Sequence, residues 1–153
     1  MRKKQVIKYS LIVFFVFIDL LTKLLLDNKS ITLINGVVRF ESSHNTGAAW
    51  SMLEGKIWFF VLGAVIFIVA INLFDHFVKP QNKWYEWGFI FMLAGTIGNA
   101  IDRLIFGYVR DFIMLEFISF PIFNVADTLL SVGVVLFSVF ILFYYDDKKK
   151  VAK

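Results

Sequence analysis

The stretch "FNVADTLLSVGVVLFSVFILFYY", residues 123–145, decides the fold, because it is long and apolar enough to cross a lipid bilayer as one helix. Its only charged side chain is Asp127, and no Lys or Arg lies within fifteen positions of it. A charge at membrane depth is costly, so such residues tend to be paired, to face a cavity or to take part in function. Asp127 is therefore the first candidate functional residue.

The composition of the whole chain agrees with a membrane protein. Of 153 residues, 59% are hydrophobic, whereas soluble domains average about 45–50%. Four stretches are long enough to span a bilayer as helices, at about 6–26, 57–78, 84–106 and 124–145. The first stretch is longer than the apolar part of a cleaved signal peptide, so we expect it to be retained. The prediction is an α-helical integral membrane protein with four transmembrane helices in one domain, residues 1–153.

A small β structure is predicted between the first two spans. Residues 30–42, "SITLINGVVRFES", alternate apolar and polar side chains around Asn35-Gly36, a pair that favours a two-residue hairpin turn. A polar turn follows, so the predicted β region covers about residues 30–50. We expect this region to lie outside the cytoplasm, because most Lys and Arg residues flank the opposite ends of the spans.

Basic residues are unevenly distributed among the loops. Ten of the sixteen Lys and Arg flank the chain ends and the second connection: Arg2, Lys3, Lys4, Lys8, Lys79, Lys83, Lys148, Lys149, Lys150 and Lys153. Cytoplasmic flanks are enriched in Lys and Arg, which predicts that both termini lie in the cytoplasm. A net charge of +4 and a pI near 9.3 could also suit nucleic acid, but this placement favours membrane lipids as the partner.

The third span has a polar face. In "LAGTIGNAIDRL", residues 93–104, helical spacing places five residues on one side: Gly95, Gly98, Asn99, Asp102 and Arg103. A helix-packing face would account for the glycines. An amide and two charges at this depth are costly, which favours a functional role.

Other polar residues have simple structural interpretations beside the functional one. Asn124 can cap the fourth helix, with Asp127 in its first turn, where the helix dipole favours an acid. Asn45 and Gly47 can form an ordinary turn after the hairpin.

The remaining acidic candidates are equally open. Asp19 and Lys23 are spaced for an ion pair along the first helix. Asp111 lies among apolar residues, which can raise the pKa of a carboxyl group. It can also be a loop residue that pairs with Arg110 or Arg103.

These residue types point to one kind of chemistry. The chain has no Cys and only two His, which excludes a thiol nucleophile and argues against thiolate or His-rich metal sites. Two neighbouring carboxyl groups can share a proton, so that one activates water while the other protonates a substrate carbonyl. That is peptide hydrolysis by an aspartyl dyad. The residues alone do not select the pair among Asp19, Asp102, Asp111 and Asp127.

Five motifs in order identify a family resemblance: "DLLTK" at 19–23, "NTGAAWSML" at 45–53, "AGTIGNAIDR" at 94–103, "GYVRDF" at 107–112 and "FNVADTLLSVGV" at 123–134. The chain resembles the lipoprotein signal peptidases (signal peptidase II), bacterial intramembrane aspartyl proteases. The motifs extend over nearly the whole chain. The family fold is four transmembrane helices with a small extracytoplasmic β-cradle.

The resemblance implies roles that the residues left open. The family's catalytic dyad falls on Asp111 and Asp127. Positions that support the dyad or contact substrate fall on the other candidates: Asp19, Lys23, Asn45, Gly47, Asn99, Asp102, Arg103 and Asn124.

The resemblance also implies the substrate and the setting. The substrate is a diacylglyceryl-modified prolipoprotein, cut before the lipidated cysteine, with no metal or cofactor. We expect a monomer in the bacterial cytoplasmic membrane, with the active site toward the extracytoplasmic side.

Two rival functions use the same features differently. A small transporter or proton relay would spread intramembrane carboxylates across the bilayer and often has inverted repeats, whereas these acids cluster on one side and no repeat is visible. A structural or assembly protein would use the polar faces only to bind partner helices.

The chain departs from the family pattern at four positions, Trp50, Ala94, Arg110 and Thr128. None of the four falls on the implied dyad. Arg110, beside Asp111, is expected to lower the pKa of that carboxyl group.

Overall fold

The computed structural model describes residues 2–47, 52–78 and 80–145. Four helices in this part of the chain are long and apolar enough to cross a membrane. They are α1 (Arg2–Leu26), α2 (Ile57–Val78), α3 (Lys83–Phe106) and α4 (Val125–Phe143). Their bounds agree closely with the predicted spans, and the predicted membrane fold is confirmed. Residues 48–50 of the predicted β region, Trp50 among them, and the carboxy-terminal lysines lie outside the described residues.

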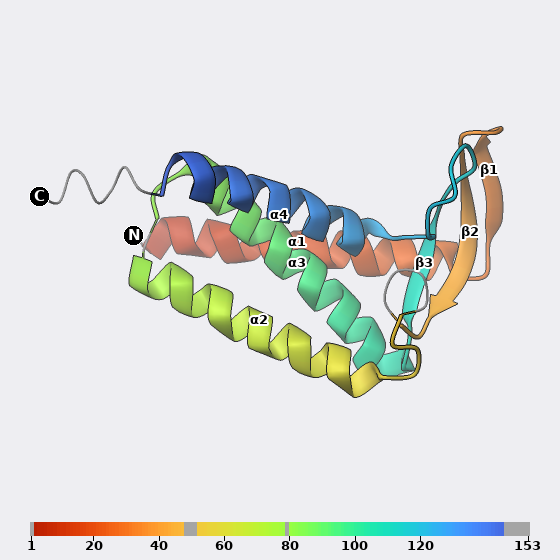
Figure 1. Ribbon diagram of the computed structural model, residues 1–153, viewed down its shortest axis with the longest axis horizontal. Helices are drawn as coiled ribbons and strands as arrows, with labels where there is room; N and C mark the ends of the chain where they lie inside the picture. Colours follow the sequence, from red (N-terminus) through yellow and green to blue (C-terminus); the bar gives the residue numbers. More distant parts are fainter. Residues whose placement is uncertain (1, 48–51, 79, 146–153) are drawn as a thin grey trace, which may run out of the picture.

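Helix α3 is the centre of the bundle and packs against α1, α2 and α4 (Figure 1). Its contact with α4 is close because Gly88 and Gly133 face the backbone of the other helix: a Cβ on Gly88 would lie 2.9 Å from Phe137 N. Small residues allow such approaches between membrane helices. The core formed there includes Phe89 and Leu93, which are almost fully buried.

The predicted hairpin is part of a three-stranded antiparallel sheet with the order β1-β2-β3. Its strands are β1 (Ser30–Ile34), β2 (Val38–Asn45) and β3 (Val109–Leu115). The loop between β1 and β2 has three residues, not the predicted two, because Ile34 pairs with Val38 and leaves 35–37 outside the ladder. Gly36 takes a φ of +71° within this loop.

Strand β3 is not among the predicted elements, and a loop was one of the alternatives for Asp111, which β3 contains. The chain leaves α3 through Gly107, which ends the helix in the left-handed conformation at φ 77°. It then reverses and pairs with β2, so that Asn45 lies opposite Val109 and Ser43 opposite Asp111.

All three strands lie at one end of the bundle, together with the end of α3 and the start of α4 (Figure 1). The α2–α3 connection and the end of α4 lie at the opposite end. The predicted polar site residues come from the elements that meet at the sheet end.

Candidate functional site

Asp111 extends from β3 toward the first turn of α4, which carries Asp127. The Asp111 side chain is 3% exposed and accepts two hydrogen bonds. Asn45 Nδ2 donates to its Oδ2 at 3.0 Å, and Asn124 Nδ2 donates to its Oδ1 at 2.6 Å. Amide donors thus hold both oxygens of this carboxyl group.

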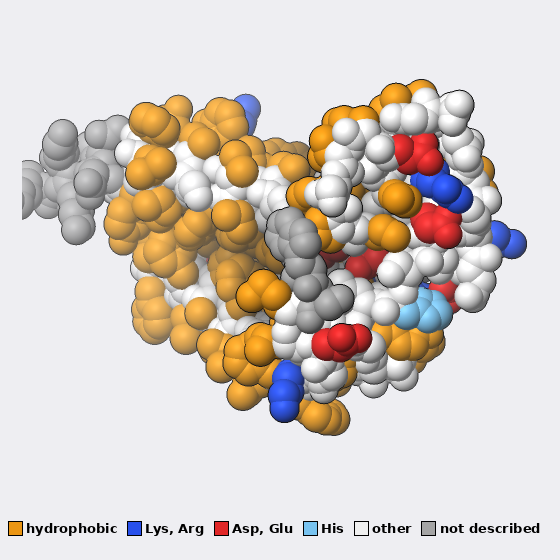
Figure 2. All heavy atoms as spheres, turned by 45° about the vertical axis from the view of Figure 1, so that its right-hand side comes forward, with side chains coloured by type: hydrophobic (Ala, Val, Ile, Leu, Met, Phe, Trp, Pro, Cys, Tyr) orange, Lys and Arg blue, Asp and Glu red, His pale blue; other side chains and the backbone are white. Residues whose placement is uncertain are grey.

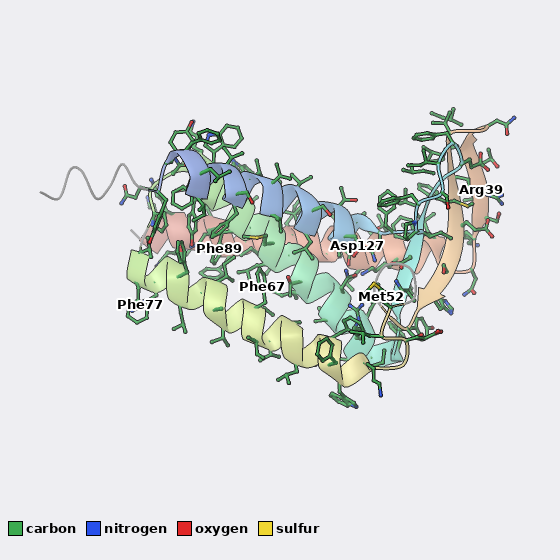
Figure 3. All side chains as sticks on the ribbon, in the orientation of Figure 1. Arg39, Met52, Phe67, Phe77, Phe89 and Asp127 are labelled. Carbon is green, nitrogen blue, oxygen red and sulfur yellow. The ribbon has the colours of Figure 1, made fainter. Side chains whose placement is uncertain are left out.

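Asp127 lies at the sheet end of the bundle (Figure 3) and is held in the same way. Asn99 Nδ2 donates to its Oδ1 at 2.7 Å, and the backbone N–H of Asn124 donates to its Oδ2 at 3.2 Å. Asn124 Oδ1 in turn accepts from the Asp127 backbone N–H at 2.9 Å. The interpretation of Asn124 as a helix cap is therefore correct, since the two residues form a capping box.

The same cap residue also joins the two carboxyl groups. Asn124 is fully buried, and its Nδ2 donates both to Asp111 and to Asn99 Oδ1, the latter at 3.1 Å. Asn99 Oδ1 also accepts from Lys23 Nζ at 2.9 Å. Because that oxygen already serves two donors, the amide nitrogen of Asn99 must point to Asp127. Together with Asn45, these two asparagines fix the position of both carboxyl groups.

A buried ion cluster lies behind these amides. Lys23 Nζ is 2.8 Å from Asp19 Oδ2 and 3.6 Å from Asp102 Oδ2, and the side chains of all three are fully buried. The predicted Asp19–Lys23 pair is present, but Lys23 also reaches α3. Buried charges persist only when they are paired and hydrogen-bonded, and this cluster joins α1 to α3.

Asp19 also joins α1 to α4. Its Oδ1 accepts from the Ala126 backbone N–H at 2.8 Å, one of the donors that a helix start leaves unsatisfied. Gly98 leaves room for this carboxylate, because a Cβ there would overlap Asp19 Oδ2. The first turn of α4, and with it Asp127, is positioned from the first span.

The expected effect of Arg110 on Asp111 is wrong. Arg110 Nη2 bonds Asp102 Oδ1 at 2.7 Å, its Nε bonds Oδ2 at 3.3 Å, and its backbone N–H bonds Oδ2 at 3.0 Å. Consecutive side chains of a strand point to opposite faces, so Arg110 turns away from Asp111. The interpretation of Asp111 as a loop residue paired with Arg110 is wrong for the same reason.

Arg103 connects the site to the turn after β2. Its Nη2 donates to the carbonyl oxygen of Gly47 at 2.9 Å, and its guanidinium lies 4.7 Å from the centre of the Phe60 ring. Asn45 Oδ1 accepts from the Gly47 backbone N–H at 2.9 Å. The predicted turn at Asn45 and Gly47 thus exists and also holds Arg103 and Asp111.

A cavity of about 820 Å³ opens beside the two aspartates and continues between α2, α3 and α4. Asp111, Asp127, Asn99 and Arg103 line its polar end. Apolar and small residues line the remainder, such as Phe67 between α2 and α3 (Figure 3). Asp19 and Asp102 do not line it. Of the four candidate aspartates, only two face this space.

The electrostatics of the Asp111 carboxyl group differ from those of an exposed acid. Burial, followed by the nearby charge of Asp127, raises the pKa of Asp111 to about 7, although the bonds from Asn45 and Asn124 oppose the shift. Asp111 is therefore mostly protonated below that pH. Two like charges at close range favour such a shared-proton state.

Some site residues had no signal in the sequence. Phe60 is one of many aromatic residues in an apolar span, and nothing in its spacing marks it as a neighbour of Arg103. Residues 120–123 also line the cavity, and their apolar character did not distinguish them from the adjoining span.

Comparisons with known proteins agree on one family. The family model described as signal peptidase (SPase) II matches residues 11–143. The lipoprotein signal peptidase of Lactiplantibacillus plantarum is 49% identical over 107 residues, which cover 69% of this chain and 70% of that protein. The protein of the same name from Enterococcus faecalis is 47% identical over 118 residues, covering 75% and 70%. A solved bacterial membrane enzyme superposes with a TM-score of 0.80 at 34% identity, covering 94% of this chain and 90% of that one.

Proposed function

The chain belongs to the signal peptidase II family, and we propose that Asp111 and Asp127 are the catalytic dyad with which it cleaves the signal peptides of lipoproteins. The observation that carries this proposal is the shared amide scaffold. Asn124 bonds both aspartates, and both face one cavity. The other two candidates, Asp19 and Asp102, are held in buried ion pairs.

The proposed reaction uses one proton shared by the dyad. In the active form of the dyad Asp111 carries the proton and donates it to the carbonyl oxygen of the scissile peptide bond. Asp127 accepts a proton from water as the water oxygen attacks the carbonyl carbon. In the tetrahedral intermediate the C–N bond then breaks, the leaving nitrogen takes a proton from the dyad, and a new carboxyl end forms. The asparagines keep the carboxyl groups oriented throughout.

The proposed substrate is a prolipoprotein with a diacylglyceryl-modified cysteine, cut just before that cysteine. The large apolar part of the cavity supports this, because it can accept acyl chains and an apolar signal segment beside the dyad. The curated relatives carry the name lipoprotein signal peptidase.

The proposed orientation places both termini in the cytoplasm and the dyad toward the extracytoplasmic side of the bacterial cytoplasmic membrane. The basic flanks support this orientation. The cavity lies within one chain, which is consistent with a monomer as the working unit.

The test is cleavage of a purified prolipoprotein with and without the diacylglyceryl group, followed by mass measurement of the released peptide. We expect cleavage before the modified cysteine, and at most slow cleavage of the unmodified protein. Asp27→Asn is a matched control, since Asp27 lies outside the cavity and bonds His44 and Ser42. A wild-type protein that fails to cleave, but carries ions across vesicles, would favour the transporter instead.

A further inference from the structure

A second, smaller cavity reaches the same aspartate from another side. It has a volume of about 340 Å³, and Asp111 and Asn45 line both cavities. Its remaining lining is mainly polar and includes Ser43, Thr46 and Glu54. Asp127 and the residues of α2, α3 and α4 that line the larger cavity do not line this one.

One segment of chain borders both cavities. Residues 120–122 line both of them, whereas Ser119 lines only the smaller one and Phe123 only the larger. This segment is held to β3, because Phe123 O accepts from the backbone N–H groups of Phe112 and Ile113 at 3.0 and 2.7 Å. Ile113 O accepts from Phe123 N at 3.1 Å. The segment that borders both cavities is therefore anchored to β3 at its Phe123 end.

The smaller cavity is built from the sheet and its adjoining loops, the part of the molecule with a mixed polar and charged surface. Figure 2 shows this surface next to the hydrophobic surface of the helices. The exposed residues at the cavity include His44, Glu54 and Ser119. A water molecule can exchange hydrogen bonds with such groups on its way to Asp111.

We propose that the smaller cavity is the route by which the hydrolytic water reaches the dyad, separate from the apolar cavity through which the lipidated substrate enters. This inference rests on the proposed function. Asp111 is the natural meeting point, because it alone of the two catalytic aspartates lines both spaces.

The physical reason for two routes is the substrate itself. A diacylglyceryl chain and a signal segment that fill the larger cavity expel water from it, and hydrocarbon supplies none. Each turnover still consumes one water. A polar passage from the outer face brings this water past Asp111 to the dyad, where Asp127 takes its proton. The apolar cavity stays closed to bulk water, which strengthens the electrostatics of the site.

The absence of cysteine in the chain makes a direct test possible, because one introduced cysteine is then the only thiol. Ser119→Cys places it in the smaller cavity, and Ser131→Cys, on α4 in the larger cavity, is the comparator. Both variants are treated in membranes with a bulky, sulfonated, membrane-impermeant thiol reagent. We expect the reagent to modify Ser119→Cys at least tenfold faster than Ser131→Cys.

Kinetics of the modified Ser119→Cys enzyme then test the role of the cavity. We expect kcat to fall at least tenfold against the same variant before modification, with KM for the lipidated substrate changed by less than twofold. A loss of packing or of substrate contacts would instead raise KM. Ser119→Phe, which narrows the cavity without a reagent, should lower kcat in the same way.

The outcomes separate this inference from the proposed function. The water route is wrong if Ser119→Cys resists the reagent, or if the modified enzyme turns over at the original rate. In either case an inactive Asp111→Asn variant would leave the dyad in place. If Asp111→Asn cleaves as fast as wild type, the proposed dyad fails whatever the labelling shows.

Discussion

Replacement of Asn45 by Ala should shift the pH dependence of cleavage upward. Asn45 Nδ2 donates to Asp111 Oδ2 at 3.0 Å, and this bond favours the ionised carboxylate. Loss of a hydrogen bond to a charged group costs about 1.5–3 kcal/mol, and one pKa unit corresponds to about 1.4 kcal/mol. Water in the adjoining cavity can replace part of the lost bond, so we expect the pKa of Asp111 to rise by about 1 unit.

The assay is kcat/KM measured against pH on a lipidated substrate, since this ratio reports the ionisation of the free enzyme. In the wild type the pKa of Asp111 is about 7, so activity should fall above that pH as the catalytic proton is lost. In Asn45→Ala the fall should begin about one unit higher. Ser42→Ala is the control, because Ser42 lies on the same strand but bonds Asp27. An alkaline limb that stays in place or moves to lower pH in Asn45→Ala would refute this reasoning.

Three further substitutions, and one control, test the scaffold around the dyad. Lys23→Met should destabilise the protein by about 3–5 kcal/mol in detergent-unfolding experiments, because it leaves two buried carboxylates without their shared cation. Gly95→Ala should lower both stability and kcat, because its Cβ would overlap the first turn of α4. Gly63→Ala, with no atom within 4 Å of the added Cβ, should leave the stability unchanged. Arg110→Val should lower the unfolding temperature through loss of the bonds to Asp102 but leave the midpoint of the alkaline limb within about 0.3 pH unit; a larger shift would show that Arg110 acts on Asp111 after all.

The helices were predictable because each apolar run is longer than a bilayer requires, and no tertiary contact is needed to define it. The pairing of Asn124 with Asp127 was predictable for a similar reason, since a capping box is local in sequence. The glycine face of α3 was also visible in the sequence, although its partner, α4, was not.

The arrangement of the proposed catalytic residues depends on contacts between residues far apart in the sequence, which the spacing of neighbouring residues does not reveal. β3 contains an arginine and an aspartate amid apolar residues, and its strand character depends on pairing with β2. Consecutive residues of a strand face opposite sides. Arg110 is therefore not the partner of Asp111, although the two are adjacent in the sequence. The bond from Lys23 to Asn99 joins residues 76 positions apart, which a single sequence does not reveal.

The most direct test of the dyad compares Asp111→Asn, Asp127→Asn and Asp102→Asn with wild type. Each purified protein is first checked for folded yield and for binding of the diacylglyceryl-modified prolipoprotein, and its cleavage rate is then measured. Both dyad variants should fold and bind substrate, yet lose at least about a thousandfold in kcat, a loss of roughly 4 kcal/mol in transition-state stabilisation. Asp102→Asn should keep measurable cleavage in proportion to its folded fraction. Substantial cleavage by folded Asp111→Asn or Asp127→Asn would contradict the account.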